Sequence, residues 1–112
     1  MPVIAIADIF GISGRRNDLV ALLTRTEQQV REARGSRRYV FAARLDTPDQ
    51  FLLLSEWDSY DAMDAYHRSE PFARYQFELS GLLARPSEMT VYSVAEEVRP
   101  LPSGPLDPRD AD

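Results

Sequence analysis

The sequence predicts an α+β domain in which a four-stranded antiparallel sheet carries its helices on one face. Four short segments are rich in β-branched and aromatic residues, as strands are. Between them lie segments whose apolar residues recur at helical spacing, and glycine or proline separates the two kinds. The chain has 112 residues, enough for one domain whose modest core buries roughly 65% of the unfolded surface.

The first predicted strand covers residues 3 to 12, VIAIADIFGI, and is apolar on both of its alternating faces. Gly11 and Gly14 are the turn residues that end it. An amphipathic helix follows, and Gly35 is expected to stop it. The helix is predicted from the spacing of Leu19, Leu22, Leu23, Thr26, Val30 and Ala33.

The second strand is predicted from about Arg37 to Leu45, before a loop in which Pro48 cannot join a ladder. The third strand, FLLLSEW, covers residues 51 to 57 and is apolar on both sides. One of its faces carries Phe51, Leu53, Ser55 and Trp57, and the other carries Leu52, Leu54 and Glu56.

Two helices are predicted before the last strand. Asp58 or Ser59 is expected to cap a short helix with one apolar edge. The run SEPF then starts another helix, because Pro71 suits a first helical position, and Pro86 stops it. A fourth strand is predicted within EMTVYSVAEEV, residues 88 to 98.

The order of these elements, βαββ(α)αβ, is that of a ferredoxin-like domain. We place this domain at residues 1 to 98. Residues 99 to 112 carry four prolines and no periodic apolar pattern, so they are expected to form a disordered tail.

The first and third strands are apolar on both faces, although the helices can cover only one face of the sheet. An exposed second face would be a larger apolar patch than soluble monomers usually tolerate. A second copy of the chain is the simplest cover, so we expect a homodimer joined through the sheets by a two-fold axis.

Composition argues against several kinds of function. With no cysteine and one histidine, we expect no disulfide, no iron–sulfur cluster and no metal site. All 13 basic residues are arginine, which excludes Schiff-base chemistry through lysine. The net charge of −5 opposes binding to nucleic acid. No apolar run approaches the roughly 20 residues of a membrane-spanning helix, so we expect no membrane association and a cytoplasmic location.

The candidate chemistry lies in residues 56 to 75, EWDSYDAMDAYHRSEPFARY, which hold the only tryptophan and the only histidine. Trp57 either lines a pocket under the helices or fills core volume. His67 has an unperturbed pKa near neutrality, which makes it the default general base or haem ligand. A lone histidine on a helix is also a common surface residue.

This stretch resembles the antibiotic biosynthesis monooxygenase family, whose central signature runs roughly E-x-W, a turn, an alanine-containing helical segment, then His, Ser, Pro and Phe. The resemblance covers about residues 3 to 95. In the family the histidine lies nine residues after the tryptophan, a place that Tyr66 holds here, with His67 one further. One helical position is a rotation of about 100°, so His67 either shares the pocket or points elsewhere.

The resemblance implies a dimeric α/β barrel and a cofactor-independent monooxygenase that oxidises a small phenolic, anthrone-like or hydroquinone substrate with O₂. Trp57, Tyr66 and His67 are therefore the expected catalytic residues. Arg44 and Arg74 either stabilise an oxyanion or form surface salt bridges. The residues expected to bind the aromatic substrate are Phe51, Leu53, Ser55, Tyr39, Phe72 and Tyr75.

Two other functions stay open. Related enzymes of the same fold bind and degrade haem with an asparagine on the first strand, a tryptophan and a histidine. Here the first-strand position is Ala7 or Asp8, depending on register. A non-catalytic dimeric domain that binds small ligands is the third possibility, because this fold carries many functions. The leading hypothesis needs no cofactor, and its alternative needs haem.

Overall fold

The structure is a computed structural model and describes residues 1–100 of the chain. Its elements follow in the order β1 (Val3–Phe10), α1 (Arg16–Glu32), β2 (Ser36–Ala43), β3 (Gln50–Trp57), α2 (Tyr60–His67), α3 (Glu70–Ser80) and β4 (Glu88–Ser93). The expected tail lies outside the described residues, apart from its first two positions. Among residues 1–100, no helix has the length and apolar character needed to span a bilayer.

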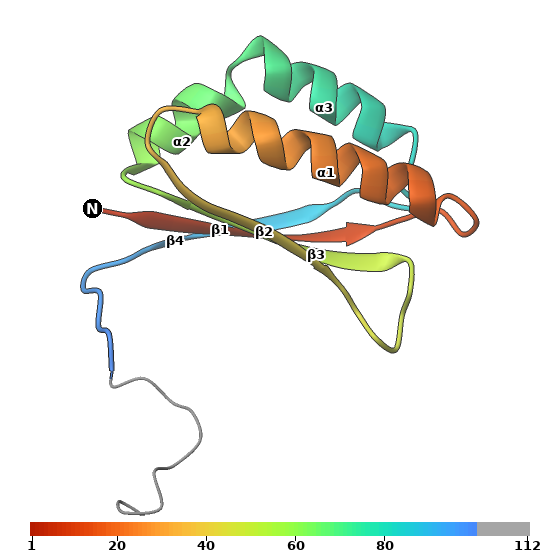
Figure 1. The fold of residues 1–112 in the computed structure, drawn as a ribbon, viewed down its shortest axis with the longest axis horizontal. Helices are drawn as coiled ribbons and strands as arrows, with labels where there is room; N and C mark the ends of the chain where they lie inside the picture. Colours follow the sequence, from red (N-terminus) through yellow and green to blue (C-terminus); the bar gives the residue numbers. More distant parts are fainter. Residues whose placement is uncertain (101–112) are drawn as a thin grey trace, which may run out of the picture.

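The four strands form one antiparallel sheet in the order β2-β3-β1-β4. All three helices lie on the same face of this sheet (Figure 1). The predicted ferredoxin-like α+β fold is confirmed. We call the face under the helices the inner face and the opposite one the outer face.

Four predicted elements are too long: the first and second strands end two residues early, at Phe10 and Ala43, and two later elements end earlier still. The last helix ends at Ser80 rather than near Pro86, because the following backbone pairs with the end of β1 instead. The N–H of Ile12 donates to the carbonyl of Leu82, and the N–H of Ala84 donates to the carbonyl of Phe10. The strand β4 ends at residue 93 rather than 98, because its only neighbour, β1, begins there in register.

Short polar signals at the helix ends act locally, as the sequence predicts. The Oγ atoms of Ser59 and Ser69 accept the N–H groups of Ala62 and Phe72, at 3.1 and 3.4 Å, and so cap α2 and α3. Gly35 follows α1 with a φ of +83°, a conformation that glycine adopts without strain. A Cβ at Gly35 would lie 2.6 Å from the Cβ of Ala62, so glycine also lets α2 approach this turn closely.

The inner face of the sheet is bulky at both ends and hollow in the middle. In register, Trp57 pairs with Val3 at one end, and Phe51 pairs with Ile9 at the other. The pairs between them include three small side chains: Ala5, Ala7 and Ser55. The buried core accordingly divides into one cluster around Phe51 and another around Trp57.

The outer face carries apolar side chains that no helix covers. Val40 and Ile6 both lie beside Leu54 in the register, and they form an apolar row across three strands. Leu52 and Tyr92 on the same face are 42% and 54% exposed. The homodimer expected from this face stays a prediction.

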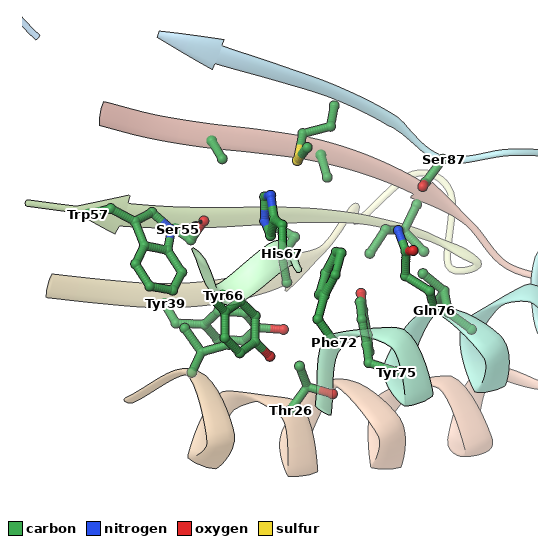
Figure 2. Close-up of a pocket in the computed structure, with 17 residues that line it drawn as sticks. Thr26, Tyr39, Ser55, Trp57, Tyr66, His67, Phe72, Tyr75, Gln76 and Ser87 are labelled. Atoms are coloured by element: carbon green, nitrogen blue, oxygen red, sulfur yellow. Dashed lines mark hydrogen bonds between the residues drawn. The ribbon is translucent and has the colours of Figure 1, made fainter. Parts of the chain in front are cut away.

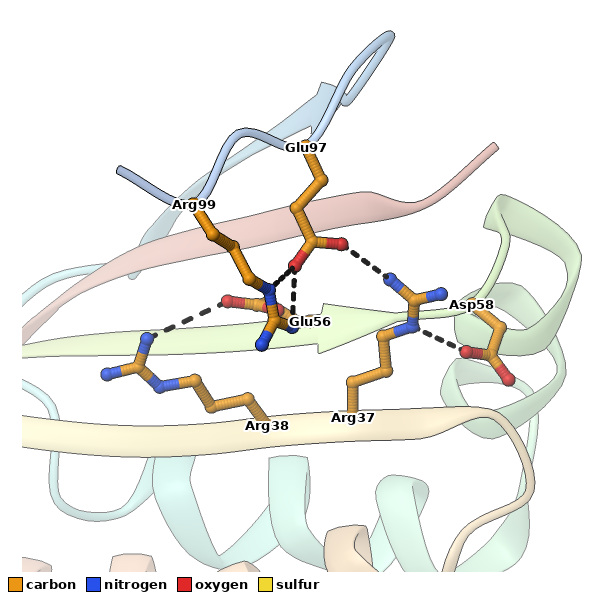
Figure 3. Close-up of polar contacts among 6 residues, drawn as sticks. All are labelled: Arg37, Arg38, Glu56, Asp58, Glu97 and Arg99. Atoms are coloured by element: carbon orange, nitrogen blue, oxygen red, sulfur yellow. Dashed lines mark hydrogen bonds and ion pairs between the residues drawn. The ribbon is translucent and has the colours of Figure 1, made fainter. Parts of the chain in front are cut away.

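One end of the outer face is charged instead of apolar (Figure 3). The segment after β4 passes across this end, because Glu97 reaches Arg37 of the far edge strand β2 at 4.0 Å. The other ion pairs here are Arg37–Asp58 at 2.6 Å, Arg38–Glu56 at 3.8 Å and Arg99–Glu97 at 2.8 Å. Such exposed pairs contribute little stability each. They mark the border of the apolar part of this face.

Candidate functional site

A cavity of about 260 Å³ lies between the inner face and the helices, where the small side chains leave room (Figure 2). Ala5, Ala7, Leu53 and Ser55 form its floor on the central strands. Its other lining residues are Ile9, Thr26, Val30, Tyr39, Trp57, Tyr66, His67, Phe72, Tyr75, Gln76, Leu79, Ser87 and Met89. Members of both core clusters contribute, so the cavity lies between the two.

Trp57 is both a core residue and a cavity wall. It is 1% exposed and belongs to one core cluster, and it also lines the cavity. Its indole Nε1 donates to the Oγ of Ser55 at 3.1 Å, so this buried N–H already has a partner within the chain. Trp57 therefore both fills core volume and lines the pocket, the two roles that the sequence left open.

Tyr66 and His67 both line the cavity, although they are neighbours on a helix. His67 is the last residue of α2, after which the chain turns into α3. Phe72, at the start of α3, stacks on the imidazole with ring centroids 4.5 Å apart and planes at 25°. Tyr66 stacks on Trp57 with centroids 5.4 Å apart. The two rings thus share one pocket in different aromatic surroundings.

The cavity holds phenol groups that remain protonated at neutral pH. Burial raises the pKa of Tyr39, Tyr66 and Tyr75 above the ordinary value for tyrosine. The pKa of Tyr39 is raised further by the negative charge that Tyr75 and Tyr66 would carry if ionised. All three side chains line the cavity. In their neutral form all three are hydrogen-bond donors.

His67 has the opposite shift, which makes it a neutral base. Burial lowers the pKa of its imidazole below the ordinary 6.5, and the carboxylate of Asp64 opposes this only in part. Asp64 itself is engaged with Arg68, whose Nε donates to it at 2.8 Å. A histidine that is neutral at pH 7 has a free nitrogen lone pair and can accept a proton from a bound molecule.

Within residues 1–100, no acidic or arginine side chain lines the cavity. The guanidinium of Arg44 binds the carboxylate of Asp46 through two hydrogen bonds of 3.0 Å at the surface. Arg74 lies 3.8 Å from Glu70 along the exposed side of α3. Of the two uses considered for these arginines, the structure therefore shows surface ion pairs.

The structure brings together all but one of the expected site residues. Phe51 is 1% exposed and packs in the other core cluster, with the guanidinium of Arg16 5.2 Å from its ring centre. It is absent from the lining, although its register partner Ile9 is part of it, because Phe51 packs into the cluster that holds Leu19 and Leu23. The expected residues that line the cavity are Trp57, Tyr66, His67, Leu53, Ser55, Tyr39, Phe72 and Tyr75.

Several lining residues were missed by the sequence interpretation. Ala5 and Ala7 lie on the same face of β1, and this pattern of small side chains indicates empty space above the middle of the sheet. Gln76, Ser87 and Met89 are exposed and come from α3 and the β4 side, so they mark the mouth of the cavity. Nothing local in the sequence distinguishes these three from ordinary surface residues.

The model of one protein family, described as antibiotic biosynthesis monooxygenase, matches residues 2–77. No curated protein matches the chain. Among solved structures, Rv0793 from Mycobacterium tuberculosis is 27% identical with a TM-score of 0.81, and the match covers 88% of this chain and 100% of that one.

Two further solved structures are similar in fold. A Deinococcus radiodurans protein, assigned provisionally as an antibiotic biosynthesis monooxygenase, is 22% identical with a TM-score of 0.83, over 89% of this chain and 99% of that one. SnoaB, a cofactor-independent oxygenase from Streptomyces nogalater, is 15% identical with a TM-score of 0.78, over 87% and 96%. Since the family match spans most of the chain, from β1 into α3, this protein belongs to the antibiotic biosynthesis monooxygenase family.

Proposed function

We propose that the protein is a cofactor-independent monooxygenase that oxidises a small, uncharged hydroxy-aromatic or anthrone-like molecule with O₂. One observation carries this proposal: an aromatic cavity without charged lining residues, among residues 1–100, contains both a neutral imidazole and buried phenol donors. Family membership and the fold of a cofactor-independent oxygenase support a monooxygenase-type reaction.

The cavity sets the size and charge of the substrate. A cavity of 260 Å³ lies just below the range of about 300 to 1,000 Å³ that is typical of small-molecule sites, so it suits a compact molecule. A bicyclic or tricyclic aromatic is such a molecule. A permanent carboxylate or phosphate would find no cation in this lining and would lose its hydration shell. The substrate therefore enters neutral and becomes an anion only inside the cavity.

In the proposed reaction, His67 takes a proton from an acidic C–H or O–H of the substrate. The resulting electron-rich anion reduces O₂, and a carbon–oxygen bond forms to give a peroxide anion. The protonated His67 returns its proton to the peroxide. The remaining C–H proton is then lost as the O–O bond breaks, so that a substrate CH₂ becomes C=O, and the outer oxygen leaves with that proton as water. The substrate supplies all the electrons, and the protein supplies orientation, a proton acceptor and hydrogen-bond donors.

Haem does not fit this lining as a second candidate. A tetrapyrrole is larger than the molecule that the cavity holds, and no arginine lines it within the described chain to meet the propionates. On the first strand, Ala7 lines the cavity, whereas Asp8 belongs to the outer face. The asparagine of the haem-degrading relatives therefore has an alanine in its place. We derive no step through haem.

The test of function is oxygen uptake by the purified protein, without added metal or flavin, over anthrones, naphthohydroquinones and haem. We expect protein-dependent uptake with the first two classes. A general base typically contributes about 10²-fold or more to the rate. Because water can replace part of this contribution, His67→Gln should lower the rate at least about tenfold. Tyr60→Phe is the matched control, because Tyr60 lies on the same helix and is 57% exposed.

Two outcomes would contradict the oxygenase proposal. A protein that binds these aromatics without consuming oxygen would be a binding domain instead. Uptake that is unchanged in His67→Gln would show that the imidazole is not the base.

We also propose that the protein is a homodimer joined through the outer faces of its two sheets. The uncovered apolar row of Val40, Leu54 and Ile6 supports this, because burying it against a second copy removes apolar area from water. Leu54→Arg should convert the dimer to a monomer in light scattering after gel filtration. Leu45→Arg is the control, at a fully exposed loop position. A monomeric wild-type mass at micromolar concentration would exclude the dimer.

A further inference from the structure

The cavity contains two hydroxyl groups that the fold leaves without a partner. The phenol oxygens of Tyr39 and Tyr66 are buried and make no hydrogen bond to any part of the described chain. The side chains are only 5% and 9% exposed. Buried polar groups in native proteins nearly always have a hydrogen-bond partner, since burial without one costs free energy.

Two other buried polar side chains of the cavity, Thr26 and Ser55, have hydrogen-bond partners within the protein. The hydroxyl of Thr26 donates to the carbonyl of Leu22 at 2.8 Å. Ser55 accepts the indole N–H of Trp57. Phenylalanine would occupy nearly the same volume as either tyrosine without burying a hydroxyl. The two hydroxyls therefore have unused hydrogen-bonding capacity, which a bound molecule can take up.

The two hydroxyls come from different elements, and both belong to residues that line the cavity. Tyr39 lies on the inner face of the edge strand β2, and Tyr66 lies in the last turn of α2. Figure 2 shows both phenol oxygens directed to the same side of the cavity, toward Phe72 and Tyr75. Both line the cavity, so a bound molecule can reach both oxygens.

We propose that Tyr39 and Tyr66 together form a two-donor site that binds one acceptor oxygen of an aromatic ketone, quinone or phenolate. Two neutral O–H donors suit a carbonyl or phenolate oxygen, which has at least two lone pairs. A carboxylate is disfavoured, because no cation lines the cavity among residues 1–100. This site would hold the substrate of the proposed oxygenase reaction, so the identity of its natural ligand rests on the proposed function.

The two-donor site also sets the orientation of the substrate. Tyr39 belongs to one edge of the sheet, and Met89 at the mouth belongs to the other edge, three strand spacings away or roughly 14 Å. A ligand that enters past Met89 with its acceptor oxygen first lays its ring plane along Trp57 and Phe72. In Figure 2 the imidazole of His67 lies toward the sheet, away from the two hydroxyls. His67 then meets the part of the ring that lies across from the acceptor oxygen, as the CH₂ of an anthrone does.

Binding of three matched probes tests the site without any turnover. The probes are 1,4-naphthoquinone, naphthalene and 1-naphthoate, which share one ring system and differ in their oxygen groups. Trp57 is the only tryptophan and lines the cavity, so its fluorescence reports binding, with calorimetry as an independent check. The chain has neither cysteine nor lysine for the quinone to alkylate. We expect the wild-type protein to prefer the quinone to both other probes.

Tyr39→Phe and Tyr66→Phe should each weaken quinone binding about tenfold, as the loss of one hydrogen bond does, and should leave naphthalene binding unchanged. The double variant should lose less than the product of the two factors, because both donors serve one oxygen and are coupled. The melting temperature of Tyr39→Phe should not fall, which separates this site from a structural role. Tyr92→Phe is the exposed control.

Equal affinity for quinone and naphthalene would overturn the two-donor site. So would a quinone affinity that Tyr39→Phe leaves unchanged. These failures are distinct from failure of the proposed function. A protein that prefers the quinone through both tyrosines and consumes no oxygen would keep this site and lose the oxygenase reaction.

Discussion

Trp57 and Tyr66 lie stacked, with ring centroids 5.4 Å apart and ring planes inclined by 28°. One ring stands at the end of β3 and the other in the last turn of α2, so the contact joins the sheet to a helix. The same pair forms one wall of the cavity. Aromatic pairs of this geometry contribute about 0.5 to 1.5 kcal/mol beyond the area that they bury. The wall of the candidate site is thus also a part of the core.

Trp57→Ala should therefore destabilise the fold as well as alter the site. The loss of a large side chain that is 1% exposed should cost about 3 to 5 kcal/mol in the free energy of unfolding. Tyr60→Ala, at an exposed position of the same region, should change it by only about 0.5 kcal/mol. Urea unfolding of both variants measures the difference. Equal costs would show that Trp57 is not the core residue described above.

Ala7→Leu should fill the hollow without harming the fold. The added methyl groups enter existing space above the middle of the sheet, so the stability change should stay below about 1 kcal/mol, against the 1 to 3 kcal/mol usual for overpacking. Binding of aromatic ligands should be lost. Ala21→Leu, at an exposed position of α1, is the control and should retain binding. Normal binding by folded Ala7→Leu would place the ligand elsewhere.

The free energy of unfolding should fall at acidic pH, because His67 is buried in its neutral form. The pKa of His67 is lower in the folded protein than the ordinary 6.5 of the unfolded chain. Below 6.5 the unfolded state therefore binds more protons than the folded state, and acid favours unfolding. The contribution of His67 is fully present above that pH and is lost as the pH falls toward the folded pKa.

Urea unfolding of the wild type and of His67→Gln between about pH 8 and pH 5 measures this contribution. The wild type should lose more stability on acidification than the variant does. Parallel curves would mean that the imidazole is not desolvated.

Gly35 and Gly14 offer a matched pair for testing how α2 is seated. Both have positive φ, at +83° and +87°, so alanine is strained at either position by about 1 to 2 kcal/mol. Only at Gly35 does the new Cβ also meet a neighbour, the Cβ of Ala62 at 2.6 Å, whereas the space around Gly14 is open. Gly35→Ala should therefore lower the melting temperature more than Gly14→Ala does. Equal effects would leave backbone strain as the whole cause.

Much of this architecture was readable from local patterns. Strand alternation predicted the inner faces of β1 and β3, because successive side chains point to opposite sides of a sheet. Ser59, one of the two capping residues considered, caps α2, and its hydroxyl satisfies a helix N–H only a few residues away. The stretch with the only tryptophan and histidine does line the cavity. These features depend on neighbours that are close in the chain.

The sequence by itself determined the order of the elements, the faces of the strands and the aromatic character of residues 56 to 75. Tertiary structure alone decided where the last helix ends, because the competing hydrogen bonds come from the distant strand β1. It also kept Phe51 out of the cavity lining and placed Tyr39 and Tyr66 in the same cavity, since that depends on how α2 packs on the sheet. Periodicity assigns a side chain to a face, but only the packing of remote elements determines which side chains on that face enclose an empty space.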